Sequence, residues 1–417
     1  MTAAMTAAHP LTFSVSGRTA RIESRLDGGE GGQGETYLAR LDGERDPLVL
    51  KLFRSRTATD AARARSEALV RADLSRLCPS VLCAPRFSLP PRVGVGHLAP
   101  LAPGRALDRH LEAPSGTYVD HLVAALALAR GVAVLERAGI AHGDLQSNNV
   151  FIETRVGHLR ARLIDFDNFA ASDQPPPPCI GQLLYLAPEI RRAANAGETC
   201  RPDVESDRFA LGVLMHELLL LRHPAEHKLD DAEVFDRTMV SGRWSDDPAA
   251  WGRKRDAGLP AELLSIPLMR LSRRAFSLDR AARPAAAHWV EALTDALGLL
   301  YRCEECRRIF MRDVDKKRCP HCRHAFPGIM LTLATGRSFA VDQQPVVLGH
   351  AETGSLRDKS RSQARLYRHG PEILIEPVGA GLARFEDGGW RPIVAPTPVM
   401  PGMRLRIADA EAKAAAL

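Results

Sequence analysis

One loop constrains the fold of this 417-residue chain more than any other feature: His142 to Asn149, which reads His-Gly-Asp-Leu-Gln-Ser-Asn-Asn. A long apolar run precedes it and two short strand-like runs follow, the second ending just before Asp165. Its polar side chains therefore lie on a loop and at a strand end, where a rigid scaffold commonly places reactive groups. Asp144, Asn149 and Asp165 supply two carboxylates and an amide, the groups that orient a hydroxyl and hold Mg²⁺ in phosphoryl transfer.

The same residues resemble the catalytic loop and the metal-binding triplet of the protein kinase superfamily, His-x-Asp-Leu-x-x-x-Asn followed by Asp-Phe-Gly. The resemblance implies that Asp144 is the catalytic base and that Asn149 and Asp165 bind Mg²⁺ on ATP. Gln146 stands where serine/threonine kinases have a lysine at the γ-phosphate, and a neutral amide stabilises developing charge less. Asp167 replaces the glycine of the triplet; aspartate tolerates a positive φ, and its carboxylate is a candidate further metal ligand.

A glycine-rich stretch comes earlier in the chain. Gly29, Gly31 and Gly34 match Gly-x-Gly-x-x-Gly between two strand-like runs. One reading is a plain Gly-rich turn, and the other is a hairpin whose backbone covers the phosphates of ATP. A dinucleotide-binding fingerprint is disfavoured, because a strand-like run and not a helix follows the glycines.

Lys51 lies in the middle of the apolar, strand-like run Leu48–Leu52. A lysine buried in such a strand is costly without a partner, so we expect one. The alternative is a lysine that reaches solvent from a half-exposed strand, which is weakened because this chain meets most of its need for positive charge with arginine. The resemblance implies that Lys51 binds the α- and β-phosphates and is held by Glu67, on a helix over residues 57–77.

The resemblance implies a bilobal α+β kinase fold over residues 11–298, with the small lobe at about 11–98 and the large lobe at about 105–298. Between the lobes, Ala99 and Leu101 lie in the segment where the adenine of ATP would bond to backbone groups.

Three later motifs occur in the order that the kinase family has them: Ala-Pro-Glu ending at Glu189, Ser-Asp ending at Asp207, and Arg-Pro starting at Arg283. The resemblance implies that Asp207 holds the backbone of the catalytic loop and that Arg283 pairs with Glu189. Small-molecule kinases of the aminoglycoside type share a His-Gly-Asp loop but lack these motifs, which favours the protein kinase branch.

The segment after the metal-binding triplet predicts how activity is controlled. Gly143 replaces the arginine that in the family binds an activation-loop phosphate, and Ser172 and Tyr185 carry the only hydroxyls between the triplet and Ala-Pro-Glu. Four consecutive prolines, residues 175–178, stiffen this segment without a phosphate. We therefore expect a kinase that is not gated by activation-loop phosphorylation.

Residues 301–327 contain four cysteines at the spacing Cys-x2-Cys-x12-Cys-x2-Cys: Cys303, Cys306, Cys319 and Cys322. The paired spacing predicts a zinc ribbon, in which four thiolates bind one tetrahedral Zn²⁺. A redox pair would need only one Cys-x-x-Cys, and a cytoplasmic location disfavours disulfides.

Residues 328–410 predict a small all-β, sandwich-like domain, because short strand-like runs alternate with Gly and Pro turns. The runs are 331–333, 346–348, 364–367, 373–375, 382–385 and 403–407. The domain resembles a forkhead-associated domain, but it has Gly349-His350 for Gly-Arg, Gln363 for a histidine, and no Asn-Gly pair. Charge-assisted bonds carry phosphate recognition, so these losses predict a domain that contacts protein without reading phosphothreonine.

Composition adds few limits. The net charge is +6 and the arginines are spread along the chain, so nothing indicates nucleic-acid binding. No uninterrupted apolar run reaches the roughly 18 residues of a membrane helix, since Arg130 interrupts the best candidate. The N-terminus lacks the pattern of a signal peptide, and we expect a cytoplasmic protein without a membrane segment.

These features predict an ATP- and Mg²⁺-dependent serine/threonine protein kinase of bacterial type that phosphorylates a partner protein. The His-Gly-Asp-Leu-Gln loop resembles kinases of tellurite-resistance-like gene clusters, which implies a metal-dependent phosphatase and a von Willebrand A-type protein as partners. Two rivals stay open: a pseudokinase scaffold that binds nucleotide, and an interaction protein acting through the zinc ribbon and β-domain. Intact Lys51, Asp144, Asn149 and Asp165 argue against both, because a decayed site has no chemical need to keep all four.

Overall fold

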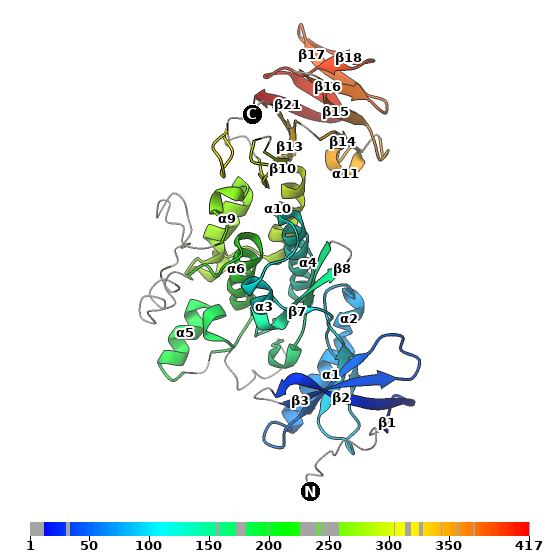
Figure 1. Cartoon of the computed structure of the whole chain (residues 1–417), viewed down its shortest axis with the longest axis vertical. Coiled ribbons are helices and arrows are strands. Elements are labelled where there is room, and N and C mark those ends of the chain that lie inside the picture. Colours follow the sequence, from blue (N-terminus) through cyan, green and yellow to red (C-terminus); the bar gives the residue numbers. More distant parts are fainter. Residues whose placement is uncertain are drawn as a thin grey trace. The chain divides into compact units, whose positions relative to one another are not determined.

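The computed structural model describes residues 12–30, 34–155, 158–171, 181–198, 200–225, 258–303, 305–312, 318–324, 328–342, 344–356, 358–369 and 372–416, with residues 239, 241 and 244. The chain divides into two compact units, Met1–Asp246 with Leu271–Val290, and Asp247–Arg270 with Glu291–Leu417. Figure 1 traces the first unit mainly in blue to green and the second mainly in yellow to red. Most of the predicted kinase region thus falls in one unit, and the cysteine-rich segment and β-domain fall in the other.

The first unit begins with a six-stranded antiparallel sheet in the order β1-β2-β3-β4-β6-β5. Figure 1 labels its first three strands. Its strands are β1 (Thr12–Val15), β2 (Arg18–Glu30), β3 (Gly34–Leu41), β4 (Leu48–Phe53), β5 (Phe87–Ser88) and β6 (Gly96–Pro100). Side chains alternate between the two faces of a strand, so Leu48 and Leu50 of β4 pack into the core of the sheet with Leu98 of β6. Lys51 lies on the other face of β4.

Helix α1 (Asp60–Ala72) packs against β5 and β6. The Thr59 side chain accepts a hydrogen bond from a first-turn N–H and caps the helix. The helix predicted over residues 57–77 is therefore shorter than expected. Asp73 takes a left-handed φ of 47°, and a separate turn of helix, α2 (Leu74–Leu77), follows it.

The remainder of the first unit is mainly helical. Its helices are α3 (Leu107–Glu112), α4 (Tyr118–Arg137), α5 (Pro188–Asn195) and α6 (Val204–Leu220), with the 3-10 turns η1 (Ser147–Asn149), η2 (Phe166–Asn168), η3 (Leu183–Tyr185) and η6 (Arg280–Ala282). A three-stranded antiparallel sheet consists of β7 (Arg105–Ala106), β8 (Val150–Arg155) and β9 (His158–Leu163). The strand-like runs predicted after the catalytic loop are confirmed as β8 and β9.

Among the described residues, α4 is the one helix long and apolar enough to cross a membrane by length and composition, with a mean hydropathy of 1.6. Most of its residues are buried inside the unit, where it packs against β9 and α6. A helix at the centre of a folded domain needs the same apolar surface. Its capping box is complete, because the Thr117 side chain accepts from the Asp120 N–H and the Asp120 carboxylate accepts from the Thr117 N–H.

Helices α9 (Ile266–Ala275) and α10 (Ala286–Gly298) each contain a point where the chain passes between the units. The second unit also contains η5 (Ala261–Leu263) and an antiparallel ribbon of β10 (Leu300–Arg302) and β11 (Ile309–Met311). Arg312, directly after β11, is fully buried and lies 4.5 Å over the Tyr301 ring. Arg312 also pairs with Asp342 of the β-domain at 3.4 Å. The cysteine-rich segment is thereby tied to the β-domain within this unit.

The β-domain has two sheets, ordered β13-β12-β21-β20-β17-β18 and β14-β15-β16-β19. Its strands are β12 (Ile329–Leu333), β13 (Ser338–Val341), β14 (Val346–Leu348), β15 (Ala364–His369), β16 (Glu372–Pro377), β17 (Leu382–Glu386), β18 (Gly389–Pro392), β19 (Thr397–Pro398), β20 (Arg404–Ile407) and β21 (Ala410–Ala416), with the helical turn α11 (His350–Thr353). Leu331 and Leu405 of one sheet share a buried core with Leu366 and Ile375 of the other. Two sheets that enclose one core form a sandwich, and all six predicted runs are strands.

The predicted end of the β-domain at residue 410 is too early. Strand β21 runs to Ala416 and pairs with both β12 and β20, so it lies inside its sheet. Its sequence, Ala-Glu-Ala-Lys-Ala-Ala-Ala, favours a helix by intrinsic propensity. Ala412 and Ala414 are buried in the core of the sandwich, and pairing on both edges overrides the propensity.

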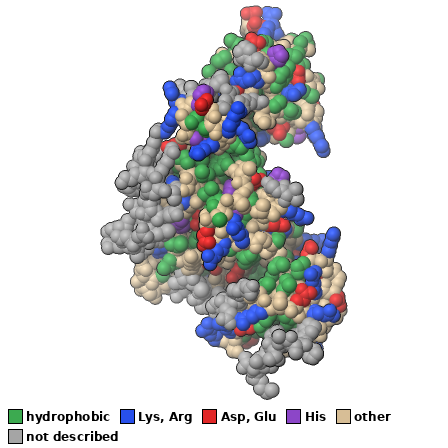
Figure 2. Space-filling view, in the orientation of Figure 1, with side chains coloured by type: hydrophobic (Ala, Val, Ile, Leu, Met, Phe, Trp, Pro, Cys, Tyr) green, Lys and Arg blue, Asp and Glu red, His purple; other side chains and the backbone are tan. Residues whose placement is uncertain are grey.

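The surface is mixed in character. Figure 2 shows that the basic side chains on the visible face are scattered in small groups among acidic and apolar ones. Large apolar side chains that are exposed occur in both units, among them Leu183 in the first and Leu356 and Val394 in the second. Single exposed apolar residues of this kind are usual on folded proteins.

Candidate active site

The carboxylate of Asp144 lies at the centre of the predicted catalytic loop. The Gln146 side chain donates to its Oδ1 at 2.8 Å, and the Asn149 side chain donates to its Oδ2 at 3.0 Å. The same Asn149 nitrogen also donates to the Asp144 carbonyl oxygen at 2.8 Å. Three of the predicted site residues are therefore brought together, with the Asp144 carboxylate held by two amides. The Asn149 oxygen takes no part in these bonds, which leaves it as the atom that could bind a cation.

Asp207 of α6 holds the backbone of this loop. The carboxylate of Asp207 accepts hydrogen bonds from the His142 and Gly143 N–H groups, at 2.5 and 3.1 Å. Burial raises the pKa of Asp207 to about 7, against the two backbone donors, which favour its charged form. The ring of His142 contacts the Ile164 carbonyl oxygen at 3.0 Å. The role implied for Asp207 is confirmed.

Gly143 stands at this position for a steric reason. Its φ of 76° lies in the left-handed region that side chains other than glycine rarely adopt. A Cβ atom built there would overlap the Asn168 carbonyl oxygen. The backbone of this loop therefore excludes the arginine that the family usually has, whatever phosphate that arginine would bind.

Lys51 has two carboxylate partners and both come from the metal-binding triplet. Its Nζ lies 2.6 Å from Asp165 Oδ1 and 2.5 Å from Asp167 Oδ2. Burial acts to lower the pKa of Lys51, but the charges of Asp167 and Asp165 outweigh it and raise the pKa above its ordinary value. Burial likewise acts to raise the pKa of Asp165, and the Lys51 charge and hydrogen bond lower it. The predicted partner for a buried lysine exists, and both groups are charged.

The prediction that Glu67 holds Lys51 is wrong in this structure. The buried residues of α1 are Ala62, Ser66 and Leu69, which form a stripe at helical spacing, while Glu67 lies off that stripe and is exposed. The positive φ of the triplet was expected at Asp167, which replaces a glycine, but it occurs at another residue. Asp165 itself has a φ of 61°, and Asp167 lies in the 3-10 turn η2.

Sequence reasoning missed His97 as a member of this site. It is buried on β6 directly opposite Lys51, with its Nε2 3.9 Å from Asp167 Oδ1 and its Nδ1 3.5 Å from Ser66 Oγ. Burial lowers the pKa of His97, which favours the neutral ring. Only the pairing register of β4 and β6 shows that His97 lies beside Lys51, and this register cannot be read from the sequence.

The glycines and the hinge are placed in part. Gly29 ends near the tip of β2, Gly34 starts β3, and Gly31 lies outside the described residues. A Cβ at Gly34 would lie 2.6 Å from the Leu52 carbonyl oxygen, so glycine is needed there for close strand pairing. Ala99 of β6 pairs with Val49 of β4, and the Leu101 N–H donates to the Pro47 carbonyl at 3.4 Å. The strand β3 follows the glycines and pairs with β2, as both readings of the motif predict.

The Ala-Pro-Glu motif is anchored as the resemblance implied. Arg283 donates from two guanidinium nitrogens to the two carboxylate oxygens of Glu189, at 2.8 and 2.7 Å. Its side chain is fully buried, and it also donates to the Glu205 and Ser277 carbonyl oxygens. In the segment before Glu189, the Tyr185 hydroxyl is buried and donates to Glu217 at 2.7 Å, while Ser172 and the four prolines lie outside the described residues.

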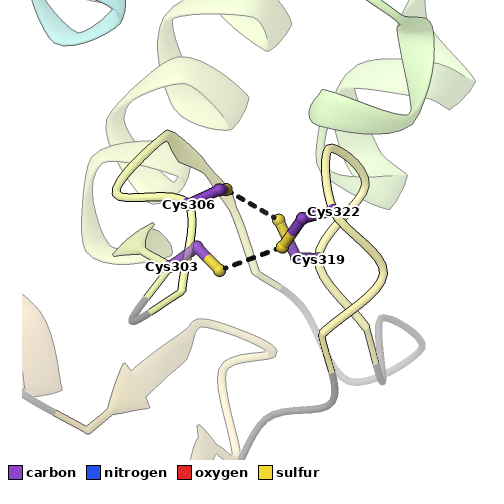
Figure 3. Close-up of side chains that lie close together, drawn as sticks. All are labelled: Cys303, Cys306, Cys319 and Cys322. Carbon is purple, nitrogen blue, oxygen red and sulfur yellow. Dashed lines mark hydrogen bonds between the residues drawn. The ribbon is translucent and has the colours of Figure 1, made fainter.

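The four predicted zinc ligands converge. Their Sγ atoms all lie within 4.8 Å of one another, and Figure 3 shows Cys303 and Cys306 facing Cys319 and Cys322. The Cys303–Cys322 and Cys306–Cys319 sulfur pairs are each 3.6 Å apart. Four thiolates at about 2.3 Å from one tetrahedral Zn²⁺ would be roughly 3.8 Å apart, so the donor set fits zinc in number, type and spacing.

The two Cys-x-x-Cys turns share one backbone design. The Arg307 N–H donates to the Cys303 carbonyl at 3.0 Å, and the Arg323 N–H donates to the Cys319 carbonyl at 2.9 Å. Arg307 and Arg323, each one residue past its second cysteine, have φ values of 61° and 66°. Two copies of the same tight turn present their sulfurs to a common point.

The residues that depart from the forkhead-associated pattern have structural partners. The Gln363 side chain is buried, accepts from the Thr353 hydroxyl at 2.8 Å and donates to the Asp358 carbonyl at 2.6 Å. The ring Nδ1 of His350 lies 2.7 Å from the Ser355 carbonyl oxygen. These side chains are used to order the loops of the sandwich.

Several known proteins with similar sequences are named as kinases. The serine/threonine-protein kinase pkn2 of Myxococcus xanthus is 29% identical over 205 residues, which is 48% of this chain and 21% of that protein. The probable serine/threonine-protein kinase PkwA of Thermomonospora curvata is 27% identical over 204 residues, 47% of this chain and 25% of that protein. The probable inactive leucine-rich repeat receptor kinase XIAO of Oryza sativa subsp. japonica is 27% identical over 185 residues, 42% of this chain and 13% of that protein.

The chain spans a quarter or less of the length of these three relatives. The family model of the protein kinase domain matches residues 24–293, which contain the catalytic loop, the metal-binding triplet and the Ala-Pro-Glu motif. That match covers more than half of the chain, so the protein belongs to the protein kinase family.

Proposed function

We propose that this protein is an ATP- and Mg²⁺-dependent kinase that phosphorylates serine and threonine hydroxyls of a partner protein. The observation that carries the proposal is the Asp144 carboxylate, held by two amides and still partly exposed. A catalytic base must be fixed in direction and open to its substrate. The relatives named serine/threonine-protein kinases support the same class of substrate.

Each residue has a part in the proposed reaction. Asp144 takes the proton of the attacking hydroxyl, and the oxygen of that hydroxyl forms a bond to the γ-phosphorus. At the same time the bond between the γ-phosphorus and the β–γ bridging oxygen breaks, and ADP leaves. Lys51 binds the α- and β-phosphates, and the backbone beside Gly34 covers them. Asn149 and Asp165 would hold Mg²⁺, which neutralises phosphate charge when bound. Asp165 fits this role, because a third of its side chain is exposed although it pairs with Lys51.

We propose that activity does not depend on phosphorylation of the activation segment. The Gly143 backbone leaves no room for an arginine that would bind such a phosphate. The Tyr185 hydroxyl is buried against Glu217, out of reach of another kinase. The buried Tyr185 hydroxyl and the absence of an arginine at position 143 both favour an enzyme whose active site is assembled without phosphorylation.

The other proposals concern the surroundings of the enzyme. Four converging thiolates support one structural Zn²⁺. The forkhead-associated-like sandwich would contact protein without reading phosphothreonine, since Gln363 and His350 are used within it. A metal-dependent phosphatase and a von Willebrand A-type protein are the partners that the likeness to tellurite-resistance kinases suggests, in the cytoplasm.

A pseudokinase scaffold is the second candidate, and the likeness to a probable inactive receptor kinase favours it. Phosphate transfer from labelled ATP, to the protein itself and to a generic serine/threonine substrate, separates the two functions. Wild type should exceed Asp144→Ala by about 10²–10⁴-fold if Asp144 is the base. Both should bind Mg·ATP, and Asp165→Ala should lose the activity. Equal transfer by wild type and Asp144→Ala, with ATP still bound, would establish the scaffold.

A further inference from the structure

Asp167 is the more deeply buried of the two carboxylates that contact Lys51. Only 4% of its side chain is exposed, compared with 35% for Asp165. A metal-binding carboxylate must remain open to the nucleotide, and Asp165 does. We propose that Asp167 is the positioning residue of Lys51 and does the work that a glutamate on α1 would otherwise do, an inference that rests on the proposed function.

Helix α1 has no carboxylate in place for this work. Its buried stripe consists of Ala62, Ser66 and Leu69, and Glu67 is exposed. The helix instead places a cation near the triplet. Arg65 is half-buried, and burial lowers its pKa although the nearby charge of Asp167 acts in the opposite direction. The carboxylates at Lys51 thus come from the triplet and not from the helix.

The surroundings of Asp167 fix its direction. Helix α1 packs against η2, the turn that contains Asp167. On its other side His97 is buried 3.9 Å from Asp167 Oδ1, and His97 is the strand neighbour of Lys51. A carboxylate enclosed by Lys51, His97 and α1 has little conformational freedom. A charge this deeply buried is tolerated only when it is paired, and Lys51 is the partner.

The arrangement has a consequence for control. A glutamate on a helix can release its lysine when the helix moves, and many kinases are switched in this way. Asp167 is two residues from Asp165, so whatever places the metal-binding carboxylate also places the anchor of Lys51. Lys51 is therefore held without a carboxylate from α1, in agreement with an enzyme that needs no activating phosphate.

Kinetics of matched variants test the assignment on the full chain. Asp167→Asn keeps the shape of the side chain and removes its charge, and Glu67→Gln makes the same change on α1. We expect Asp167→Asn to lower kcat about 10–100-fold at saturating Mg·ATP, as a slightly misplaced phosphate ligand does, with a smaller effect on the Kd of Mg·ATP. Glu67→Gln should stay within about two-fold of wild type, as expected for a surface change. Wild-type kcat in Asp167→Asn, or an equal loss in Glu67→Gln, overturns the proposal.

Thermal unfolding of the nucleotide-free chain gives a second test that needs no turnover. If Asp167 anchors Lys51, the shifts in Tm caused by Lys51→Met and Asp167→Asn must be non-additive, the second change costing less once the first is made. The Lys51→Met and Glu67→Gln pair should be additive. Additive shifts for Lys51 and Asp167 overturn the anchor even in an active enzyme. Coupled shifts in a protein that transfers no faster than Asp144→Ala keep the anchor and reject only the proposed function.

The same variants separate anchoring from metal binding. If Asp167 were a Mg²⁺ ligand, Asp167→Asn would raise the Mg²⁺ concentration needed for Mg·ATP binding in the Lys51→Met background as well. If it is the anchor, Asp167→Asn should leave the Mg²⁺ requirement of Lys51→Met unchanged. A shifted Mg²⁺ requirement in that background contradicts the assignment.

Discussion

Two amides donate to the Asp144 carboxylate, and one of them belongs to Gln146, where related kinases have a lysine. A hydrogen bond from a neutral amide orients the carboxylate, but it adds no positive charge beside the moving phosphoryl group. In the proposed reaction, this exchange leaves the γ-phosphate without a positive charge from residue 146.

We therefore predict that Gln146→Lys preserves or raises kcat, by up to about ten-fold, because the new charge acts as the transition state forms. The Kd of Mg·ATP should change little, since the contact matters least in the ground state. Gln146→Met, of similar length without polar atoms, is the control and should lose activity. Steady-state transfer and calorimetric binding decide the matter, and a Gln146→Lys protein with lower kcat and unchanged ATP binding would count against the role.

Gly143 and Gly139 offer a second residue-scale comparison. Both have a positive φ, 76° and 67°, but a Cβ at Gly143 overlaps the Asn168 carbonyl while a Cβ at Gly139 has open space around it. Gly139→Ala should cost only the backbone strain, about 1 kcal/mol of unfolding free energy, and Gly143→Ala about 3 kcal/mol or more. Denaturant unfolding measures both values. Equal costs would mean that the Asn168 contact relaxes at no expense.

At the scale of elements, buried Arg283 connects the end of η6 to α5 through Glu189. Arg280 reaches the same glutamate at 3.5 Å, but 36% of its side chain is exposed. Breaking a buried pair leaves an uncompensated charge, so Arg283→Ala should cost about 3–5 kcal/mol of unfolding free energy. Arg280→Ala should cost less, about 1–2 kcal/mol, because its ion pairs with Glu189, Asp203 and Glu205 are partly exposed. Chemical denaturation of both variants checks the ranking, and a reversed order would show that the exposed arginine carries the helix.

Elements whose sequence and surroundings agree were the predictable ones. Strand β4, the strands after the catalytic loop and six strands of the sandwich follow from alternating apolar residues and turn signals. Strand β21 did not, because its alanines favour a helix and only its two neighbouring strands make it extended. The prediction that Glu67 is the partner of Lys51 was wrong for a similar reason, because it depends on how elements pack against one another. Glu67 is the only glutamate of its helix, but the helical phase that turns it outward depends on how α1 packs.

At the scale of the whole chain, two compact units carry separate chemistry. The first contains the catalytic loop, Lys51 and the metal-binding triplet, and the second contains the four cysteines and the sandwich. Within the second unit, the buried Arg312 joins the cysteine-rich segment to Asp342 of the sandwich, and Arg368 contacts the same carboxylate. A disturbance at the cysteines should therefore spread through the second unit through buried charges.

Zinc removal tests this division. The segment of residues 301–327 is too short to bury a core of its own, so metal binding should supply a large part of its folding free energy. We predict about one Zn²⁺ per chain by elemental analysis of protein purified without chelator.

Cys306→Ser should lose the metal and make the second unit sensitive to protease, because three thiolates cannot complete the tetrahedral site and Arg312 loses its support. Cys200→Ser, which alters a cysteine outside the cluster, is the matched control and should keep its zinc. Binding of Mg·ATP should be unchanged in both variants, since Lys51, Asn149 and Asp165 belong to the first unit. A wild-type protein without zinc, or a Cys306→Ser protein that no longer binds Mg·ATP, would refute the corresponding part of this prediction.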